Sequence, residues 1–143
     1  MAHGQDVYDL QRFLEAQSGV YEQACAELRA GRKRSHWMWF VFPQIHGLGS
    51  SPMAVRYAIS SLDEARAYLE HVVLGSRLRE SAGIVVGVQG KTVGEIFGSP
   101  DDMKFHSSMT LFAKATEGLG DVFEEALAKY FGGAMDQGTI RRI

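Results

Sequence analysis

The feature that most constrains the fold is a run of six apolar residues at positions 37–42, which contains both tryptophans of the chain. A run of this kind is typical of a buried segment, and periodicity cannot separate a strand from a helix over so few residues. Its aromatic residues favour a strand, but the one candidate partner strand is at residues 83–88, and nearly every other segment has helical spacing. We therefore expect a helix, with Ser35 as its N-cap and Pro43 ending it.

The rest of the chain carries signals for helix starts and helix ends at short intervals. They include acidic and hydroxyl caps, two capping boxes, a proline in the first helical position and glycines after the last turn. The expected starts are Asp6 or Asp9, Val20, Ser51, Ser61 (with Glu64), Thr92 (with Glu95), Ser99 and Asp121. A further helical segment has Leu74, Leu78, Ala82, Val85 and Val86 on its inner side. We expect a turn at residues 118–120 and a mobile tail after Gly132. The pattern predicts one all-α domain over residues 1–143, with about seven or eight helices.

Length and composition exclude several classes of protein. A chain of 143 residues can form one domain that needs no disulfide or metal to fold. Its net charge of −2, from 15 basic and 17 acidic residues, gives no overall field that would attract nucleic acid or an anionic membrane. We see no secretory signal and no apolar stretch of the ~20 residues that a membrane span needs. With a single cysteine, Cys25, expected in the core, these features indicate a cytoplasmic protein without a membrane or nucleic-acid partner.

Three stretches of the chain resemble the signature of a known family. They are residues 32–44, residues 49–51 followed by Tyr57, and residues 102–104 followed by residues 107–112. The pattern is similar to that of the bacterial and fungal family called domain of unknown function 1810, sometimes labelled calpastatin-like. The resemblance covers nearly the whole chain and implies a single all-helical domain. It implies no activity and no catalytic residue, since none is assigned in that family.

Polar residues beside the most apolar segments form the candidate site. Glycines at positions 47 and 49 precede the helix start at Ser51, where backbone amides can approach an anion. The other Ser-Pro start, at Ser99, has two carboxylates in its first turn, which would repel a phosphate. The predicted ligand-binding residues are Lys33, His36, Trp39, Gln44, Ser50, Ser51, Tyr57, Lys104 and Ser108.

Each of these features also has an ordinary structural interpretation, which the sequence leaves open. The basic residues 32–34 can complement a helix C-terminus, the tryptophans can belong to the core, and the polar residues 104–108 can bond to neighbouring backbone. A phosphate loop ending at residues 90–92 is excluded, because Val85 stands where its first glycine is required. The histidines have no zinc-binding spacing and the single cysteine gives them no partner, so we expect no metal and no other cofactor.

Two classes of function remain. The first is a pocket for a small polar or anionic, nucleotide-like ligand beside the Trp-rich segment, either in a binding protein or in an enzyme. In an enzyme, His36 would be the candidate for proton transfer, because the ordinary pKa of histidine is near neutrality. The second class is a protein-protein interaction module without chemistry, in which the tryptophans are core and helix faces bind a partner.

Overall fold

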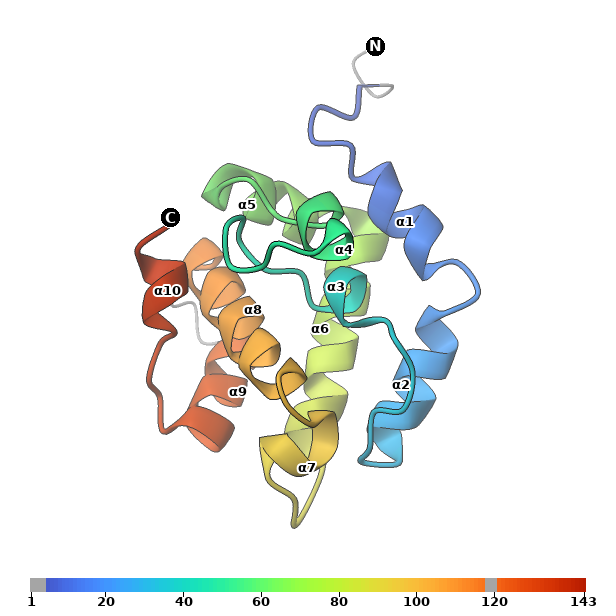
Figure 1. The fold of residues 1–143 in the computed structure, drawn as a ribbon, viewed down its shortest axis with the longest axis vertical. Coiled ribbons are helices and arrows are strands. Elements are labelled where there is room, and N and C mark those ends of the chain that lie inside the picture. The colour runs from blue at the N-terminus through green and yellow to red at the C-terminus, as the bar shows by residue number, and fades with distance from the viewer. Residues whose placement is uncertain (1–4, 118–120) are drawn as a thin grey trace.

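The computed structural model describes residues 5–117 and 121–143 (Figure 1). Within these ranges every regular element is a helix, apart from one isolated bridge between Ile45 and Ile59. The helices are α1 (Gln11–Gln17), α2 (Tyr21–Arg29), α3 (Met38–Val41), α4 (Pro52–Arg56), α5 (Leu62–Glu70), α6 (Val72–Gly87), α7 (Val93–Phe97), α8 (Asp101–Ala115), α9 (Val122–Phe131) and α10 (Gln137–Ile140). The all-α prediction is confirmed, although the described residues contain more helices than the seven or eight expected. The predicted turn at residues 118–120 lies outside the described residues.

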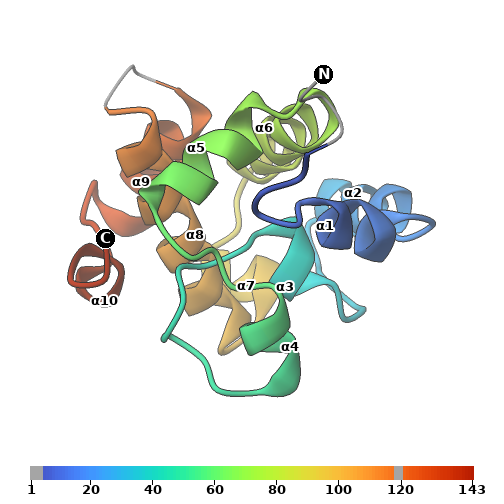
Figure 2. The same cartoon turned by 90° about the horizontal axis from the view of Figure 1, so that it is seen from above.

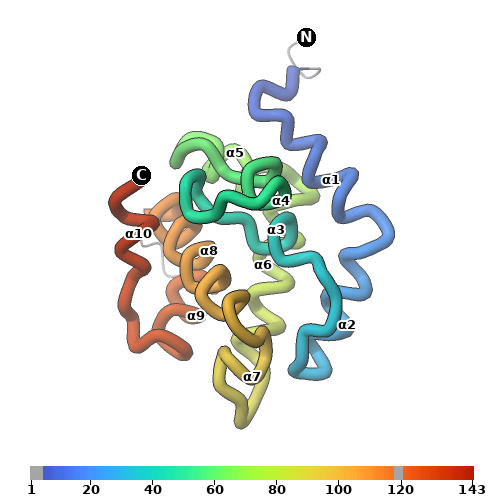
Figure 3. Tube along the Cα trace, viewed as in Figure 1, coloured from blue at the N-terminus to red at the C-terminus, as the bar shows by residue number. Residues whose placement is uncertain are grey.

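The two longest helices, α6 and α8, form the centre of the molecule. Helices α5 and α9 each pack against both of them, while α2 packs on α6 and α10 packs on α8. Figure 2 shows the result from above, with α1 and α2 on one side and α9 and α10 on the other. The tube in Figure 3 shows the chain from α3 to α4 passing in front of these central helices. No helix in the described part of the chain is long and apolar enough to cross a membrane.

The apolar run at residues 37–42 lies in the core, as its composition predicts. Trp37 and Phe42 are fully buried. The ring of Phe42 packs edge-on against Phe97 and Phe105, with centroids 5.9 and 5.1 Å apart. These aromatic contacts fix the segment against α7 and α8, at the centre of the molecule.

Four of the expected helix starts are confirmed by their caps. The side-chain oxygens of Ser51, Ser61 and Asp121 each accept a hydrogen bond from a backbone N–H two or three residues further on. Thr92 and Glu95 form a reciprocal capping box. These bonds satisfy amides that the helix itself leaves unpaired, which is why such short-range patterns predict helix starts well.

Two other expected caps are wrong. Trp37, not Ser35, occupies the N-cap position of α3, because the Ser35 hydroxyl instead donates to the buried carboxylate of Glu27. Pro100, not Ser99, occupies the N-cap position of α8, and the first-turn amide of Met103 is satisfied by the Asp102 carboxylate. Helix α3 is therefore a single turn held by the core rather than a capped helix.

The C-terminal segment is not the mobile tail that the sequence predicts. After α9 the chain turns back onto α8 and forms α10, in which Thr139 is fully buried. Asp136 caps α10, and its own backbone N–H donates to the hydroxyl of Thr110 on α8 at 2.9 Å. The segment has a glycine and only one helical turn, so its order depends on these tertiary contacts, which local sequence signals do not reveal.

Candidate functional site

Glu27, on the inner side of α2, holds the basic segment at residues 32–37 in place. This residue is 4% exposed. One carboxylate oxygen accepts bonds from the backbone N–H groups of Arg34 and Ser35, at 2.8 and 3.0 Å, and from the indole of Trp37, at 2.9 Å. Two further side-chain donors reach the other oxygen. Burial opposes the charged form, but these bonds outweigh it and hold the pKa of Glu27 well below its ordinary value.

Two lysines share the carboxylate of Asp101 at the start of α8. The Lys33 Nζ lies 2.9 Å from Asp101 Oδ2, and the Lys104 Nζ lies 3.6 Å from Oδ1. Each ammonium also lies over an indole, Lys33 over Trp37 and Lys104 over Trp39, at 5.2 Å from the ring centroid. The Lys33 side chain is 8% exposed and also donates to a backbone carbonyl, whereas Lys104 is 26% exposed. Lys33 is thus part of the structure, and Lys104 remains accessible to a ligand.

A groove of about 450 Å³ opens beside Lys104, and we call it the α8–α10 groove. Three segments that are far apart in the sequence meet there: residues 44–54, the first half of α8, and the start of α10. Its polar lining consists of Gln44, Ser50, Ser51, Lys104, Ser107 and Asp136. Its apolar lining includes Leu48, Ala54, Pro100 and Met103. The groove therefore combines a cation, an anion and uncharged polar groups with aliphatic surface.

Two glycines next to or in this groove allow the C-terminal segment to approach the connection that precedes α4. A Cβ atom on Gly47, where φ is +87°, would lie 2.7 Å from the Nε of Arg142. A Cβ atom on Gly138 would lie 3.2 Å from a methyl group of Leu48. The C-terminal segment thus packs directly on the connection that precedes α4.

Six of the predicted site residues lie in or next to the groove. Gln44, Ser50, Ser51 and Lys104 line it. Trp39 and Tyr57 line an adjoining space, together with Gln44, of only about 10 Å³, room for a single water. The Ser51 hydroxyl already caps α4 by accepting a bond from the Ala54 N–H at 3.1 Å, so it is less free for a ligand than the sequence indicates.

The other three predicted site residues, Lys33, His36 and Ser108, lie outside the groove lining. Lys33 is bound to Asp101, and His36 is exposed on the basic segment. Ser108 is fully buried, and its Oγ is the one buried side-chain nitrogen or oxygen without a hydrogen-bond partner among the described residues.

Sequence reasoning missed one charged residue of the groove, Asp136, because it lies in the supposed tail. Its Oδ2 accepts bonds from the hydroxyl of Ser107 at 3.0 Å and from the N–H and hydroxyl of Thr139 at 3.0 and 2.6 Å. Burial raises the pKa of Asp136, but the bonds from Thr139 and Ser107 outweigh it and hold this pKa below its ordinary value. The Asp-x-x-Thr spacing at residues 136–139 is the one local signal that could have found this cap.

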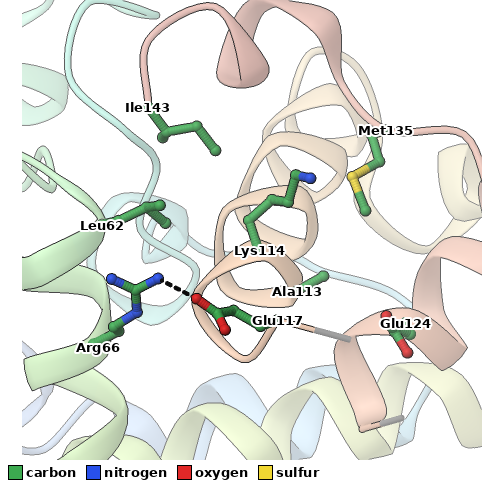
Figure 4. Close-up of a pocket in the computed structure, with 8 residues that line it drawn as sticks. All are labelled: Leu62, Arg66, Ala113, Lys114, Glu117, Glu124, Met135 and Ile143. Carbon is green, nitrogen blue, oxygen red and sulfur yellow. Dashed lines mark hydrogen bonds and ion pairs between the residues drawn. The ribbon is translucent and has the colours of Figure 1, made fainter. Parts of the chain in front are cut away.

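A second cavity, of about 510 Å³, lies between α5, α8, α9 and the C-terminal segment (Figure 4). Arg66 and Glu117 form an ion pair at 3.0 Å beside it, and Arg66 lies 3.7 Å from Asp63. Glu124 adds a further carboxylate to the lining. The Arg66 guanidinium is already paired with two acids, and two carboxylates, Glu117 and Glu124, line this cavity together with Arg66 and Lys114. The lining of the α8–α10 groove has one carboxylate, so the groove is the better site for an anion.

Neither the cysteine nor a cluster of metal-binding side chains adds a further candidate site in the described ranges. Cys25 is buried on α2, as expected, and burial raises the pKa of its thiol, which keeps it neutral. Residues 5–117 and 121–143 contain no group of three or more His, Cys, Asp or Glu side chains that could hold a metal ion.

Comparisons with known proteins identify the family of this chain. A family model described as "Protein of unknown function (DUF1810)" matches residues 7–143. The crystal structure of the conserved hypothetical protein Rv1873 from Mycobacterium tuberculosis is 60% identical, with a TM-score of 0.92 over 95% of this chain and 96% of that chain. A comparison with curated proteins finds no match. The chain therefore belongs to the DUF1810 family of proteins of unknown function, the family that its three signature stretches resemble.

Proposed function

We propose that this protein binds a small polar ligand with an anionic group, and that the ligand occupies the α8–α10 groove. The observation that carries the proposal is the position of Lys104, an accessible ammonium on the wall of a cavity of about 450 Å³. This volume is within the range of about 300–1,000 Å³ that is usual for small-molecule sites. Gln44 and Ser50 line the same cavity and supply uncharged donors and acceptors.

The electrostatics of Lys104 support an anionic ligand group. Its contact with Asp101 is long, at 3.6 Å, so a ligand oxygen could approach the ammonium more closely than this carboxylate does. The partial burial of Lys104 strengthens such a contact relative to one in bulk water. Among the described residues the Gln44 side chain has no hydrogen-bond partner, so its amide is free to bind the ligand as well.

The surroundings of Trp39 limit the kind of ligand. The ammonium of Lys104 covers the indole at 5.2 Å from its centroid, and the space beside Trp39 is only about 10 Å³. Within this space a nucleotide base has no room to stack on the ring. Contact with a less polar part of the ligand falls instead to the aliphatic lining near Leu48 and Met103.

A thermal-shift screen of nucleotides, sugar phosphates and ADP-ribose derivatives tests the proposal. A ligand at about 100 times its Kd stabilises the protein by about 2.7 kcal/mol. The stabilisation should disappear in Lys104→Gln and persist in the control variant Lys114→Gln. Lys114 is a matched residue, because it is exposed on the same helix but lines the other cavity. A ligand that stabilises both variants equally would place its site elsewhere and refute the proposal.

The alternative function, an interaction module, has one observation in its favour. Met103 is 67% exposed at the groove, where this apolar side chain could contact a partner. If no compound stabilises the protein, and a captured partner still binds Lys33→Ala and Lys104→Ala, the interaction module is the better interpretation. We propose no reaction, since His36, the expected proton-transfer group, lies outside the groove lining.

A further inference from the structure

The two carboxylate oxygens of Asp136 are used unequally. Oδ2 accepts the three hydrogen bonds from Ser107 and Thr139. Oδ1 has no hydrogen-bond partner among the described residues. It is not fully buried, because the one buried side-chain nitrogen or oxygen without a hydrogen-bond partner in those residues is the Oγ of Ser108. Asp136 is thus held rigidly through one oxygen, while the other remains a free acceptor on a residue that lines the groove.

Lys104 and Asp136 line the same groove without pairing with each other. Lys104 pairs with Asp101 instead, and no ion pair joins it to Asp136. Ser107 follows Lys104 by three residues, about 4.5 Å along the helix axis, and its hydroxyl lies 3.0 Å from Asp136 Oδ2. Because both charged residues line the same cavity of about 450 Å³, one small molecule that fills it can contact both.

These two charges require different partners. An ammonium binds an anion, whereas an ionised carboxylate is an acceptor only, so it repels an anion and binds a hydrogen-bond donor. A partly buried charge is costly unless a partner satisfies it. We infer that the ligand carries both kinds of group: an anionic group that contacts Lys104, and a hydroxyl or ammonium group that donates to the free oxygen of Asp136. This inference rests on the proposed function and specifies its ligand class, which includes sugar phosphates, amino-sugar phosphates and phosphorylated amino acids.

Chemical-shift titrations of isotope-labelled protein test the inference with defined probes. The organic probes are ribose 5-phosphate, glucose 6-phosphate, glucosamine 6-phosphate and phosphoserine, and inorganic phosphate represents the anion alone. At least one organic probe should bind about tenfold more tightly than inorganic phosphate, because one added charge-assisted hydrogen bond contributes about 1.4 kcal/mol or more. Its shifts should fall on the backbone amides of Gly49, Lys104 and Asp136.

Substitution of Asp136 separates a ligand contact from a structural role. Asp136→Asn replaces one carboxylate oxygen by an N–H donor and keeps an acceptor for Thr139. It should reduce the preference for the organic probe about tenfold, while binding of inorganic phosphate stays unchanged or improves because a negative charge is gone. Asp136→Ser, which retains a capping side chain but has no second oxygen, provides the same test if the Asn variant does not fold.

The outcomes distinguish this inference from the proposed function. If inorganic phosphate binds wild-type protein as tightly as every organic probe, the inference is wrong and the proposed function stands. The same holds if Asp136→Asn weakens phosphate and organic probes equally, since that result indicates a structural role. If neither phosphate nor any organic probe binds, the inference is wrong, and the thermal-shift screen alone decides the proposed function.

Discussion

Replacement of Glu27 by glutamine should destabilise the protein strongly, although the substitution is nearly isosteric. In Glu27→Gln the amide oxygen can keep the three bonds from Arg34, Ser35 and Trp37, but they are no longer bonds to a charged group. A bond to a charged acceptor contributes about 1.5–3 kcal/mol and a neutral one about 0.5–1.5 kcal/mol, so the three together lose about 3 kcal/mol. Glu27→Ala removes the acceptor of all five donors and should cost more.

The pH dependence of this effect has a definite sign. The pKa of Glu27 is lower in the folded protein than in the unfolded chain, so the unfolded state binds more protons and stability rises with pH. The contribution of Glu27 is fully present above the unfolded pKa of about 4.3 and is lost as the pH falls through the folded value. The difference between wild type and Glu27→Gln should therefore be constant near neutrality and should shrink below about pH 4.

Urea denaturation across this pH range measures both effects. The free energy of unfolding of Glu27→Gln should be lower by about 3 kcal/mol at neutral pH, with an unchanged m-value. Glu22→Gln is the matched control, since Glu22 is exposed on the same helix and its loss should cost about 0.5 kcal/mol or less. If Glu27→Gln unfolds like this control, or if its difference from wild type does not vary between neutral and acid pH, the assigned role of Glu27 is wrong.

Two further predictions concern buried small residues. A Cβ atom on Gly75 would lie 2.1 Å from the carbonyl oxygen of Leu69, so Gly75→Ala should cost more than about 3 kcal/mol. A Cβ atom on Gly87, in the same helix, would have no atom within 4 Å, so Gly87→Ala should be neutral or stabilising by up to about 1 kcal/mol. Equal effects of the two substitutions in thermal unfolding would refute the packing argument. Ser108→Ala removes an unpartnered hydroxyl and should leave the Tm unchanged or raise it. Ser107→Ala loses the hydrogen bond to Asp136 and should lower the stability by about 1 kcal/mol. A lower Tm for Ser108→Ala would show that the Ser108 hydroxyl has a partner.

Local patterns in the sequence predicted much of the fold. The caps at Ser51, Thr92 and Asp121 satisfy amides of their own helices, so the information for them is contained in a few neighbouring residues. The composition of residues 37–42 predicts a buried segment, and all of these residues except the partly buried Trp39 are buried. Helix α10 was missed because its single turn depends on packing against α8, which no local pattern records.

The candidate site was harder to predict, because its residues come together only in the folded chain. Lys33 and Lys104 both lie in stretches that resemble the family signature, yet one is bound in a buried network and the other lines the groove. The identity of the buried acid that organises the basic segment, Glu27, could not be predicted either, since its partners lie seven to ten residues away in a separate segment. Asp136 was assigned to a mobile tail, although it is the acid of the groove.

A crystal structure of the protein with a compound that stabilises it tests the central claim most directly. The account predicts electron density for the compound in the α8–α10 groove, with an anionic group at hydrogen-bond distance from the Nζ of Lys104. Density for the compound in the cavity beside Arg66, or on a surface away from Lys104, would contradict it.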